Sequence, residues 1–244
     1  MITKENTSTD TWQAPVYKQT RAVTIDTSVA KANHCLVTTE NKEAVAGMEV
    51  LRSHLLNHTR TNGWRTVMIT SAQPGEGKTL TAINLALTMA REYQQTVVLV
   101  DADLRKPSVA QYLGIGPQPG LADYFLGDTP LQDIMLWPGV EKLTMIAGDK
   151  AVPNAAEIMG SPKMKELVLE LKDRYQDRYA LFDLPPLLAL ADPISFIDHV
   201  DCVLLVVEAG QTSSRDIKKA QSLIPDDKLL GLVLNRDTAP RQPY

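Results

Sequence analysis

Short runs of consecutive apolar residues recur along the chain and predict the strands of a buried sheet. The first two runs, residues 66–70 and 96–100, are each followed at once by polar or glycine-containing sequence. Because the apolar positions are consecutive rather than alternating, both faces of the predicted sheet must be covered, which is typical of parallel strands. The later runs are residues 142–146, 179–182, 203–207 and 230–234.

The segments between these runs have the spacing or composition of helices. Apolar residues within 41–56 fall near helical spacing, and residues 80–87, 121–126 and 214–223 are also predicted helices. A further helix begins at Ser161 and Pro162, because serine caps a helix and proline fits its first turn. Strands therefore alternate with helices. This order predicts an α/β fold, a doubly wound, mainly parallel sheet with helices on both faces.

The same pattern divides the chain into three parts. Residues 1–38 are rich in Thr, Ser, Lys and Asn and show no sustained period, which predicts a flexible N-terminal arm. Residues 39–236 contain no internal repeat and no linker, so they form one predicted domain. Residues 237–244 are a short C-terminal tail.

Composition narrows the possible functions. The chain has 244 residues, of which 44% are hydrophobic, enough for one large α/β core. The formal net charge of -4 provides no basic field for nucleic acid. No apolar run approaches the roughly 18 residues that span a bilayer, and residues 1–12 lack the apolar core of a signal peptide. These features predict a cytoplasmic protein with no transmembrane segment of its own, in which Cys35 and Cys202 are ordinary reduced thiols.

Residues 71–79 read S-A-Q-P-G-E-G-K-T and predict a phosphate-binding loop. The segment lies between a predicted strand and a predicted helix, so its backbone N–H groups and the helix N-terminus can surround an anion. Lys78 can reach the β- and γ-phosphates of ATP, and the Thr79 hydroxyl can bind Mg²⁺. The predicted ATP contacts are Gln73, Pro74, Gly75, Glu76, Gly77, Lys78, Thr79, Leu80, Arg105 and Asn235.

Two further predicted strands end in aspartates. Asp101 and Asp103 follow residues 96–100, and Asp183 follows residues 179–182. Ligands of open parallel sheets bind where strands end, so these carboxylates are expected to converge on the phosphate loop. We predict Thr79, Asp101 and Asp183 as metal ligands. The predicted catalytic residues are Lys78, Asp101 and Asp103.

Simpler interpretations of the same residues remain open. Each aspartate could cap a turn or pair with Arg105, and Arg105 and Lys106 could be surface charges. Asn235, at the end of the last predicted strand, suits either the adenine edge or a turn.

Together these segments resemble the bacterial tyrosine kinases of capsule and exopolysaccharide export, a branch of the MinD/ParA-like P-loop ATPases. Residues 101–107, D-A-D-L-R-K-P, resemble the Walker A′ motif of that family, and residues 182–186, F-D-L-P-P, resemble its Walker B motif. Smaller similarities extend the resemblance over residues 40–236. The absence of a lysine between Ser71 and Gly77 disfavours a Min/Par-type ATPase.

The resemblance implies an ATP- and Mg²⁺-dependent tyrosine autokinase that regulates capsular or exopolysaccharide synthesis and export. It also implies a membrane chain-length regulator, or polysaccharide co-polymerase, as activator, and hence a peripheral position at the inner face of the plasma membrane. It further implies a homo-oligomer. The alternative is a regulatory ATP-binding or ATPase module of the export machinery without tyrosine kinase activity.

Two departures from the family favour that alternative or weaken the expectation of a ring. The family has a C-terminal tyrosine cluster, whereas this sequence has only Tyr244 there, which is the candidate phosphoacceptor. The E-x-x-R-x-x-R motif of the family falls on Ala46, Glu49 and Arg52, so only its last arginine remains.

Overall fold

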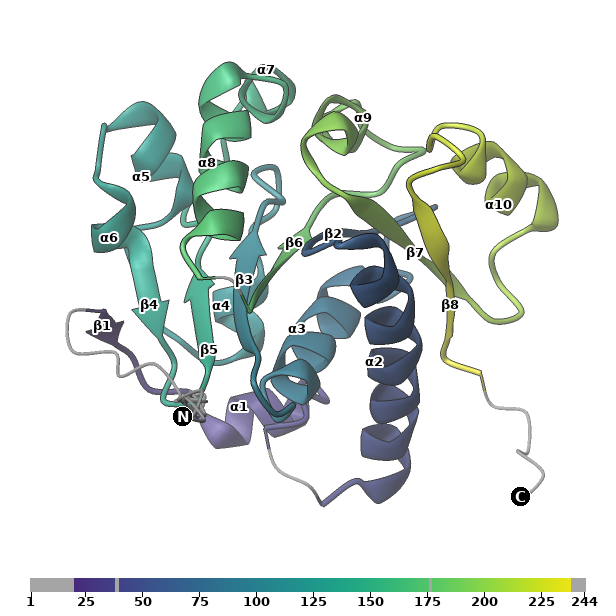
Figure 1. Cartoon of the computed structure of the whole chain (residues 1–244), viewed down its shortest axis with the longest axis horizontal. Helices are drawn as coiled ribbons and strands as arrows, with labels where there is room; N and C mark the ends of the chain where they lie inside the picture. Colours follow the sequence, from purple (N-terminus) through teal and green to yellow (C-terminus); the bar gives the residue numbers. More distant parts are fainter. Residues whose placement is uncertain (1–19, 38–39, 176, 238–244) are drawn as a thin grey trace, which may run out of the picture.

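The computed structural model describes residues 20–37, 40–175 and 177–237 of the chain. Its centre is an eight-stranded sheet with the order β1-β4-β5-β3-β6-β2-β7-β8 (Figure 1). All of its strand pairs are parallel except β4 with β5. The strands are β1 (Arg21–Ala22), β2 (Thr66–Ser71), β3 (Thr96–Asp101), β4 (Met135–Trp137), β5 (Leu143–Ile146), β6 (Arg178–Asp183), β7 (Cys202–Glu208) and β8 (Leu229–Asn235).

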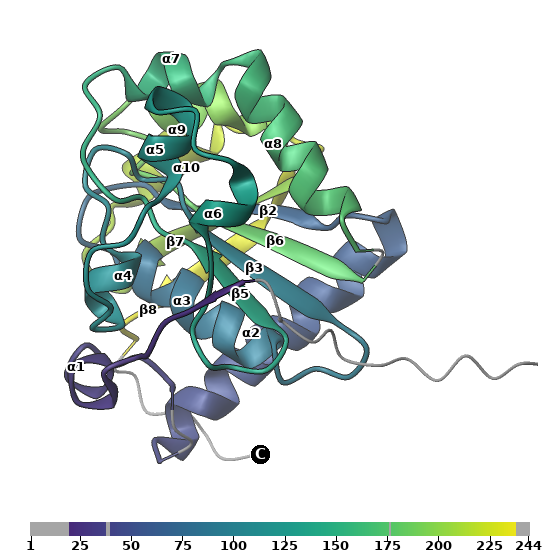
Figure 2. The same ribbon diagram turned by 90° about the vertical axis from the view of Figure 1, so that its left-hand side faces the viewer.

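Helices cover both faces of this sheet, as the sequence predicts (Figure 2). One face packs against α1 (Thr27–Ala32), α2 (Lys42–Asn62), α3 (Lys78–Met89) and α4 (Val109–Tyr112). The other face packs against α5 (Leu121–Leu126), α6 (Leu131–Ile134), α7 (Ala155–Met159), α8 (Pro162–Asp173), α9 (Asp192–Phe196) and α10 (Ser214–Gln221), with the short 3₁₀-helix η1 (Ile197–His199). Every residue of β2, β3 and β6 is buried, which explains their unbroken apolar runs.

Local sequence explains how the long helices begin and end. The Ser161 hydroxyl accepts a hydrogen bond from the Met164 N–H at the start of α8, and Pro162 occupies the first turn. Helix α2 continues to Asn62, beyond the predicted end at residue 56, and ends at Gly63 in the left-handed conformation. In the middle of α2, Arg52 donates to the Thr88 carbonyl and lies 3.4 Å from Glu92.

The N-terminal region differs from the flexible arm predicted for residues 1–38. Residues 20–37 contain β1 and α1, and Ala30, Cys35 and Leu36 are buried against the domain. Asp26 caps α1 by accepting hydrogen bonds from the N–H groups of Ser28 and Val29. The segment is too short to carry a helical period, and its position depends on contacts with α3 and α4. The part of the predicted arm in residues 1–19 lies outside the described residues.

Because the neighbouring strands β2, β3, β6, β7 and β8 are parallel, their carboxyl ends meet at one edge of the sheet. The loops after β2, β3 and β6 gather at this edge, between the two helix layers (Figure 2). Within the described part of the chain, no helix is both long enough and apolar enough to cross a membrane.

Gly114 packs directly against α1, so a substitution at this position tests whether α1 is part of the folded domain. Gly114 has a φ of 65°, and an added Cβ would lie 2.6 Å from the Asp26 Cβ and 2.9 Å from the Val29 Cβ. We expect Gly114→Ala to destabilise the protein by about 1–3 kcal/mol and to expose α1 to protease. Urea unfolding and limited proteolysis measure both effects. Gly116→Ala, where no atom lies within 4 Å of the added Cβ, is the matched control. Equal proteolysis of both variants would contradict the prediction.

Candidate active site

The phosphate loop connects β2 to α3 and carries two left-handed glycines. Gly75 has a φ of 89° and Gly77 a φ of 90°, conformations that glycine adopts without steric cost. Gly77 directly precedes α3, so the helix N-terminus faces the loop. A side chain at Gly77 would also collide with Asn235, whose amide donates a 2.8 Å hydrogen bond to the Glu76 carbonyl. The end of β8 therefore fixes the backbone of the loop.

Lys78 holds together the carboxylates that the sequence predicts to converge. Its ammonium lies 2.8 Å from Asp103 Oδ2 and 3.4 Å from Asp183 Oδ1. Thr79 donates a 2.6 Å hydrogen bond to Asp183 Oδ2. The side chains of Lys78, Asp103 and Asp183 are 13%, 7% and 0% exposed, so this charge cluster is largely removed from water.

Burial governs the electrostatics of the cluster. Desolvation raises the pKa of Asp183 and raises that of Asp101 to about 7, with the neighbouring carboxylates adding to the effect. Burial alone would lower the pKa of Lys78, but Asp183 and Asp103 together raise it above its ordinary value. The Lys78 charge in turn lowers the pKa values of Asp101 and Asp183 against the effect of burial, so it favours their ionised forms.

Asp101, the last residue of β3, orders the loop that follows this strand. Its Oδ2 accepts hydrogen bonds from the N–H groups of Ser108 and Val109, at 2.8 and 2.9 Å. Its Oδ1 is buried and has no hydrogen-bond partner. Asp101 thus caps the turn after β3 and also keeps one unsatisfied oxygen.

A cavity of about 910 Å³ opens above this cluster. Most of the predicted ATP contacts line it, and so does the predicted base Asp103. The lining residues that the sequence predicts are Pro74, Gly75, Gly77, Lys78, Thr79, Leu80, Asp103, Arg105 and Asn235.

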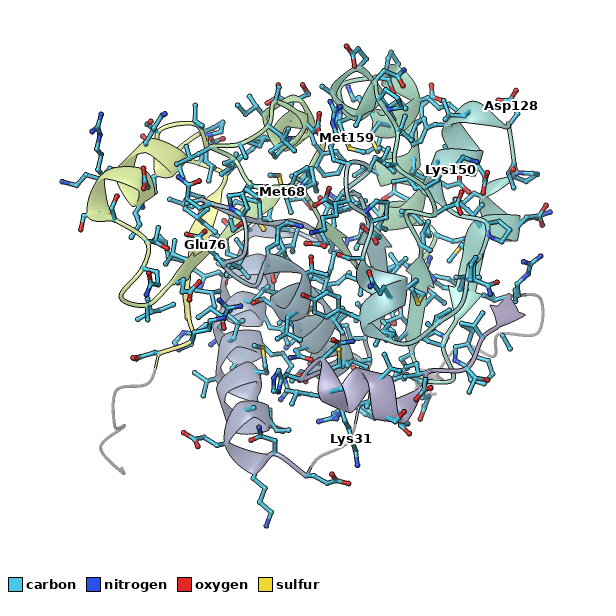
Figure 3. All side chains as sticks on the ribbon, turned by 180° about the vertical axis from the view of Figure 1, so that it is seen from behind. Lys31, Met68, Glu76, Asp128, Lys150 and Met159 are labelled. Carbon is cyan, nitrogen blue, oxygen red and sulfur yellow. The ribbon has the colours of Figure 1, made fainter. Side chains whose placement is uncertain are left out.

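Two predicted ATP contacts, Gln73 and Glu76, do not line the cavity. Glu76 instead accepts a 2.8 Å hydrogen bond from the Gln73 N–H and a short one from the Thr212 hydroxyl. Its buried carboxylate therefore connects the phosphate loop to the segment that follows β7. Glu76 is marked in Figure 3, which shows the molecule from behind.

Arg105 lines the cavity, but its guanidinium is already engaged. It contacts both oxygens of the buried Asp192, at 2.9 and 3.1 Å, and donates to the Pro153 carbonyl. The partner is Asp192 rather than the site aspartates considered from sequence. Arg105 therefore ties the loop after β3 to the segments that carry α7 and α9.

The side chains present fit Mg²⁺ in the manner of P-loop enzymes. No group of three or more His, Cys, Asp or Glu side chains forms a ready-made metal cage in the described ranges. Mg²⁺ in such enzymes typically takes one or two protein oxygens, and the phosphates and water supply the rest. The hydrogen-bonded Thr79 and Asp183, with the unsatisfied Oδ1 of Asp101 nearby in the cluster, provide that chemistry.

Other lining residues were not predicted from the sequence. Three of them lie next to predicted site residues: Pro185 and Pro186 follow the Walker B-like aspartate, and Arg236 follows Asn235. Asn33 and His34, at the end of α1, and Gln111 and Tyr112, in α4, come from segments without a phosphate-binding pattern. Only tertiary packing brings these four residues to the cavity. The remaining lining residues are Lys106, Ser108, Ala189 and Leu190.

Comparison with known proteins agrees with this geometry. A family model described as "ParA: NUBPL iron-transfer P-loop NTPase" matches residues 64–239. Tyrosine-protein kinase YwqD of Bacillus subtilis is 36% identical over 173 residues, covering 70% of this chain and 72% of that protein. The crystal structure of the VpsO kinase domain aligns with a TM-score of 0.70 and 32% identity, covering 81% of this chain and 97% of that domain. Succinoglycan biosynthesis transport protein ExoP of Rhizobium meliloti is 32% identical over 184 residues, which are 22% of its length.

Removal of the Lys78 charge should destabilise the fold itself. We expect Lys78→Met to lower the free energy of unfolding by about 3–5 kcal/mol near pH 7.5, because buried carboxylates lose their counter-charge. Urea denaturation monitored by circular dichroism measures the loss. Lys150→Met is the control, since Lys150 forms a solvent-exposed ion pair with Asp123, and its urea midpoint should stay nearly unchanged. Equal midpoints for the two variants would contradict a stabilising role for Lys78.

The raised pKa of Asp101 predicts a specific pH dependence of stability. The folded protein binds this proton more tightly than the unfolded chain, so stability falls as pH rises from about 4 to about 7. Asp101→Asn lacks this proton but keeps an oxygen for the two N–H donors. We expect its Tm relative to wild type to improve between pH 5 and pH 8, measured by scanning calorimetry. The control is Asp128→Asn, because the Asp128 side chain is 94% exposed, and its Tm should change with pH in parallel with that of wild type. A parallel Tm profile for Asp101→Asn would contradict the raised pKa of Asp101.

Proposed function

The chain belongs to the bacterial tyrosine kinase branch of the ParA-like P-loop NTPases, and from this premise we propose that it transfers the γ-phosphoryl group of ATP to tyrosine hydroxyls. The observation that carries the proposal is the contact between Lys78 and Asp103 on the cavity wall. A phosphate-binding lysine and a candidate proton acceptor lie 2.8 Å apart at one end of the cavity.

Lys78 and Asp103 have complementary roles in this reaction. The phosphates of ATP compete with Asp103 for the Lys78 ammonium, so nucleotide binding makes the carboxylate available. Asp103 then accepts the tyrosine hydroxyl proton as the phenolic oxygen bonds to the γ-phosphorus. The bond from phosphorus to the β,γ-bridging oxygen breaks, and ADP leaves. Lys78 stabilises the charge on the transferred group.

Asp101 and Asp183 support the site from below. Asp101 orders the loop that carries Asp103 through its hydrogen bonds to Ser108 and Val109. Asp183 and Thr79 would hold Mg²⁺, with Asp101 near it. The metal ion would neutralise charge on the β- and γ-phosphates. Because Asp103 lines the cavity and Asp101 does not, Asp103 is the better candidate for the base.

The enzyme acts in capsular or exopolysaccharide synthesis and export. The matching part of ExoP, a protein named for succinoglycan transport, supports this setting. A membrane chain-length regulator would activate the kinase and hold it at the inner face of the plasma membrane. The chimerical protein CapA2B2, 25% identical with a TM-score of 0.73, supports a two-component arrangement. We also propose a homo-oligomer. Arg52, the one arginine kept from the family's ring-assembly motif, donates to the Thr88 carbonyl of its own chain.

The direct test is phosphosite mapping after incubation with Mg²⁺ and ATP. We expect phosphotyrosine on the wild-type protein and none on Lys78→Met, provided that the variant is shown to be folded at the assay temperature. The map also decides whether Tyr244, which lies outside the described residues, is an acceptor. Release of ADP without phosphotyrosine would support the alternative, a regulatory ATPase.

Asp103→Asn separates proton transfer from binding. We expect this variant to bind ATP within about threefold of wild type but to transfer phosphate about 10²–10⁴ times more slowly, the usual contribution of a general base. Isothermal titration and radiolabel transfer measure the two quantities. Asp149→Asn, a partly exposed aspartate at the same edge, serves as the control. Loss of ATP binding in step with transfer would assign Asp103 to the metal site instead.

A further inference from the structure

The cavity has two ends, which the strand order distinguishes. Lys78 contacts Asp103, which follows β3, and Asp183, which ends β6, and both strands lie on one side of β2. Asn235 ends β8, which lies on the other side of β2. A nucleotide bound at the phosphate loop therefore directs its terminal phosphate toward β6 and β3 and its nucleoside toward β8.

The end beyond the terminal phosphate is walled by two segments distant in sequence. Asn33 and His34 follow α1, and Gln111 and Tyr112 end α4, which is attached to the loop after β3. Together with Lys106, these four residues are called the acceptor wall below. Figure 2 shows α1 and α4 close together at the sheet edge where the catalytic loops gather.

A buried asparagine fixes this wall relative to the phosphate loop. Asn84 lies in α3, the helix that begins at the loop, and is only 5% exposed. Its Nδ2 donates to the His34 carbonyl at 3.2 Å, and its Oδ1 accepts from the Leu36 N–H at 2.8 Å. The Asn33 amide donates to the Tyr112 carbonyl at 3.1 Å, so α1 is joined to α4 as well. The His34 backbone is held with a φ of 61°.

The backbone of the turn is thus tightly held while its imidazole is presented to solvent. His34 and Lys106 are both exposed, and neither side chain contacts a carboxylate among the residues that the structure describes. By contrast, the neighbouring Lys78 and Arg105 are paired with aspartates. The acceptor wall therefore offers a free cation and a free imidazole at the end where the phosphate acceptor must enter.

We propose that the acceptor wall binds the tyrosine-bearing peptide, with His34 and Lys106 contacting acidic or polar groups beside the acceptor tyrosine. This inference rests on the proposed kinase function and assigns a role to residues 33–34, which line the cavity but carry no phosphate-binding pattern. The wall determines acceptor affinity and leaves ATP binding to the phosphate loop and Asn235.

The test uses the full chain and a random glutamate–tyrosine copolymer as acceptor. His34→Gly removes the imidazole, and glycine suits the left-handed backbone, so the fold is preserved. We expect the KM for the copolymer to rise about tenfold, while kcat and the KM for ATP change less than about twofold. His58→Ala, at an exposed position of α2, is the matched control and should keep the wild-type constants.

Other outcomes overturn the proposal. An unchanged copolymer KM in His34→Gly, an equal rise in His58→Ala, or a rise confined to the KM for ATP would each do so. Anisotropy of labelled copolymer on ADP-loaded protein separates this proposal from the kinase function. If the wild type binds copolymer without transferring phosphate, the kinase proposal fails, and weaker binding by His34→Gly still supports the wall. Equal binding by both proteins, or none, refutes the wall itself.

Discussion

The ion pairs of Lys78 with Asp103 and Asp183 are the interaction on which the site depends. Three parallel strands, β2, β3 and β6, lie next to one another and end at one edge, so the fold forces their terminal polar residues into a space with little water. Carboxylates crowded in this way favour the protonated form unless a cation is present. The Lys78 ammonium supplies that cation from within the chain. In the proposed mechanism the phosphates of ATP compete with the carboxylates for this ammonium, which would couple stability to nucleotide affinity.

Sequence predicts this centre well because its signals are local. A buried parallel strand needs consecutive apolar residues, so β2, β3 and β6 are recognised within one or two residues of their ends. The phosphate loop and the aspartates follow these strands directly, and their convergence follows from parallel topology alone. Helix α8 is equally clear, because Ser161 and Pro162 determine its first turn without help from distant residues.

The parts that sequence does not predict are those held by distant contacts. Strand β1 has two residues and α1 has six, too few for either period to emerge. Strand β1 is held by its pairing with β4. The position of α1 comes from contacts with Asn84, Tyr112 and Gly114, which lie between about 50 and 90 positions further along the chain. The same dependence hides Asn33 and His34 from motif analysis. Glu76 is the opposite case: its place in the motif suggests a nucleotide contact, but its side chain binds Thr212.

The phosphate loop is one continuous segment of sequence, but residues far along the chain stabilise its conformation. Glu76 is fixed by Thr212 after β7, and its carbonyl accepts the Asn235 amide at the end of β8. Gly77 has no room for a side chain because Asn235 is there. A peptide with the correct motif would keep the residue types but lose these braces, and its glycines would sample many conformations. The conformation of the phosphate loop therefore depends on contacts with the segment after β7 and with the end of β8, both far from the motif in sequence.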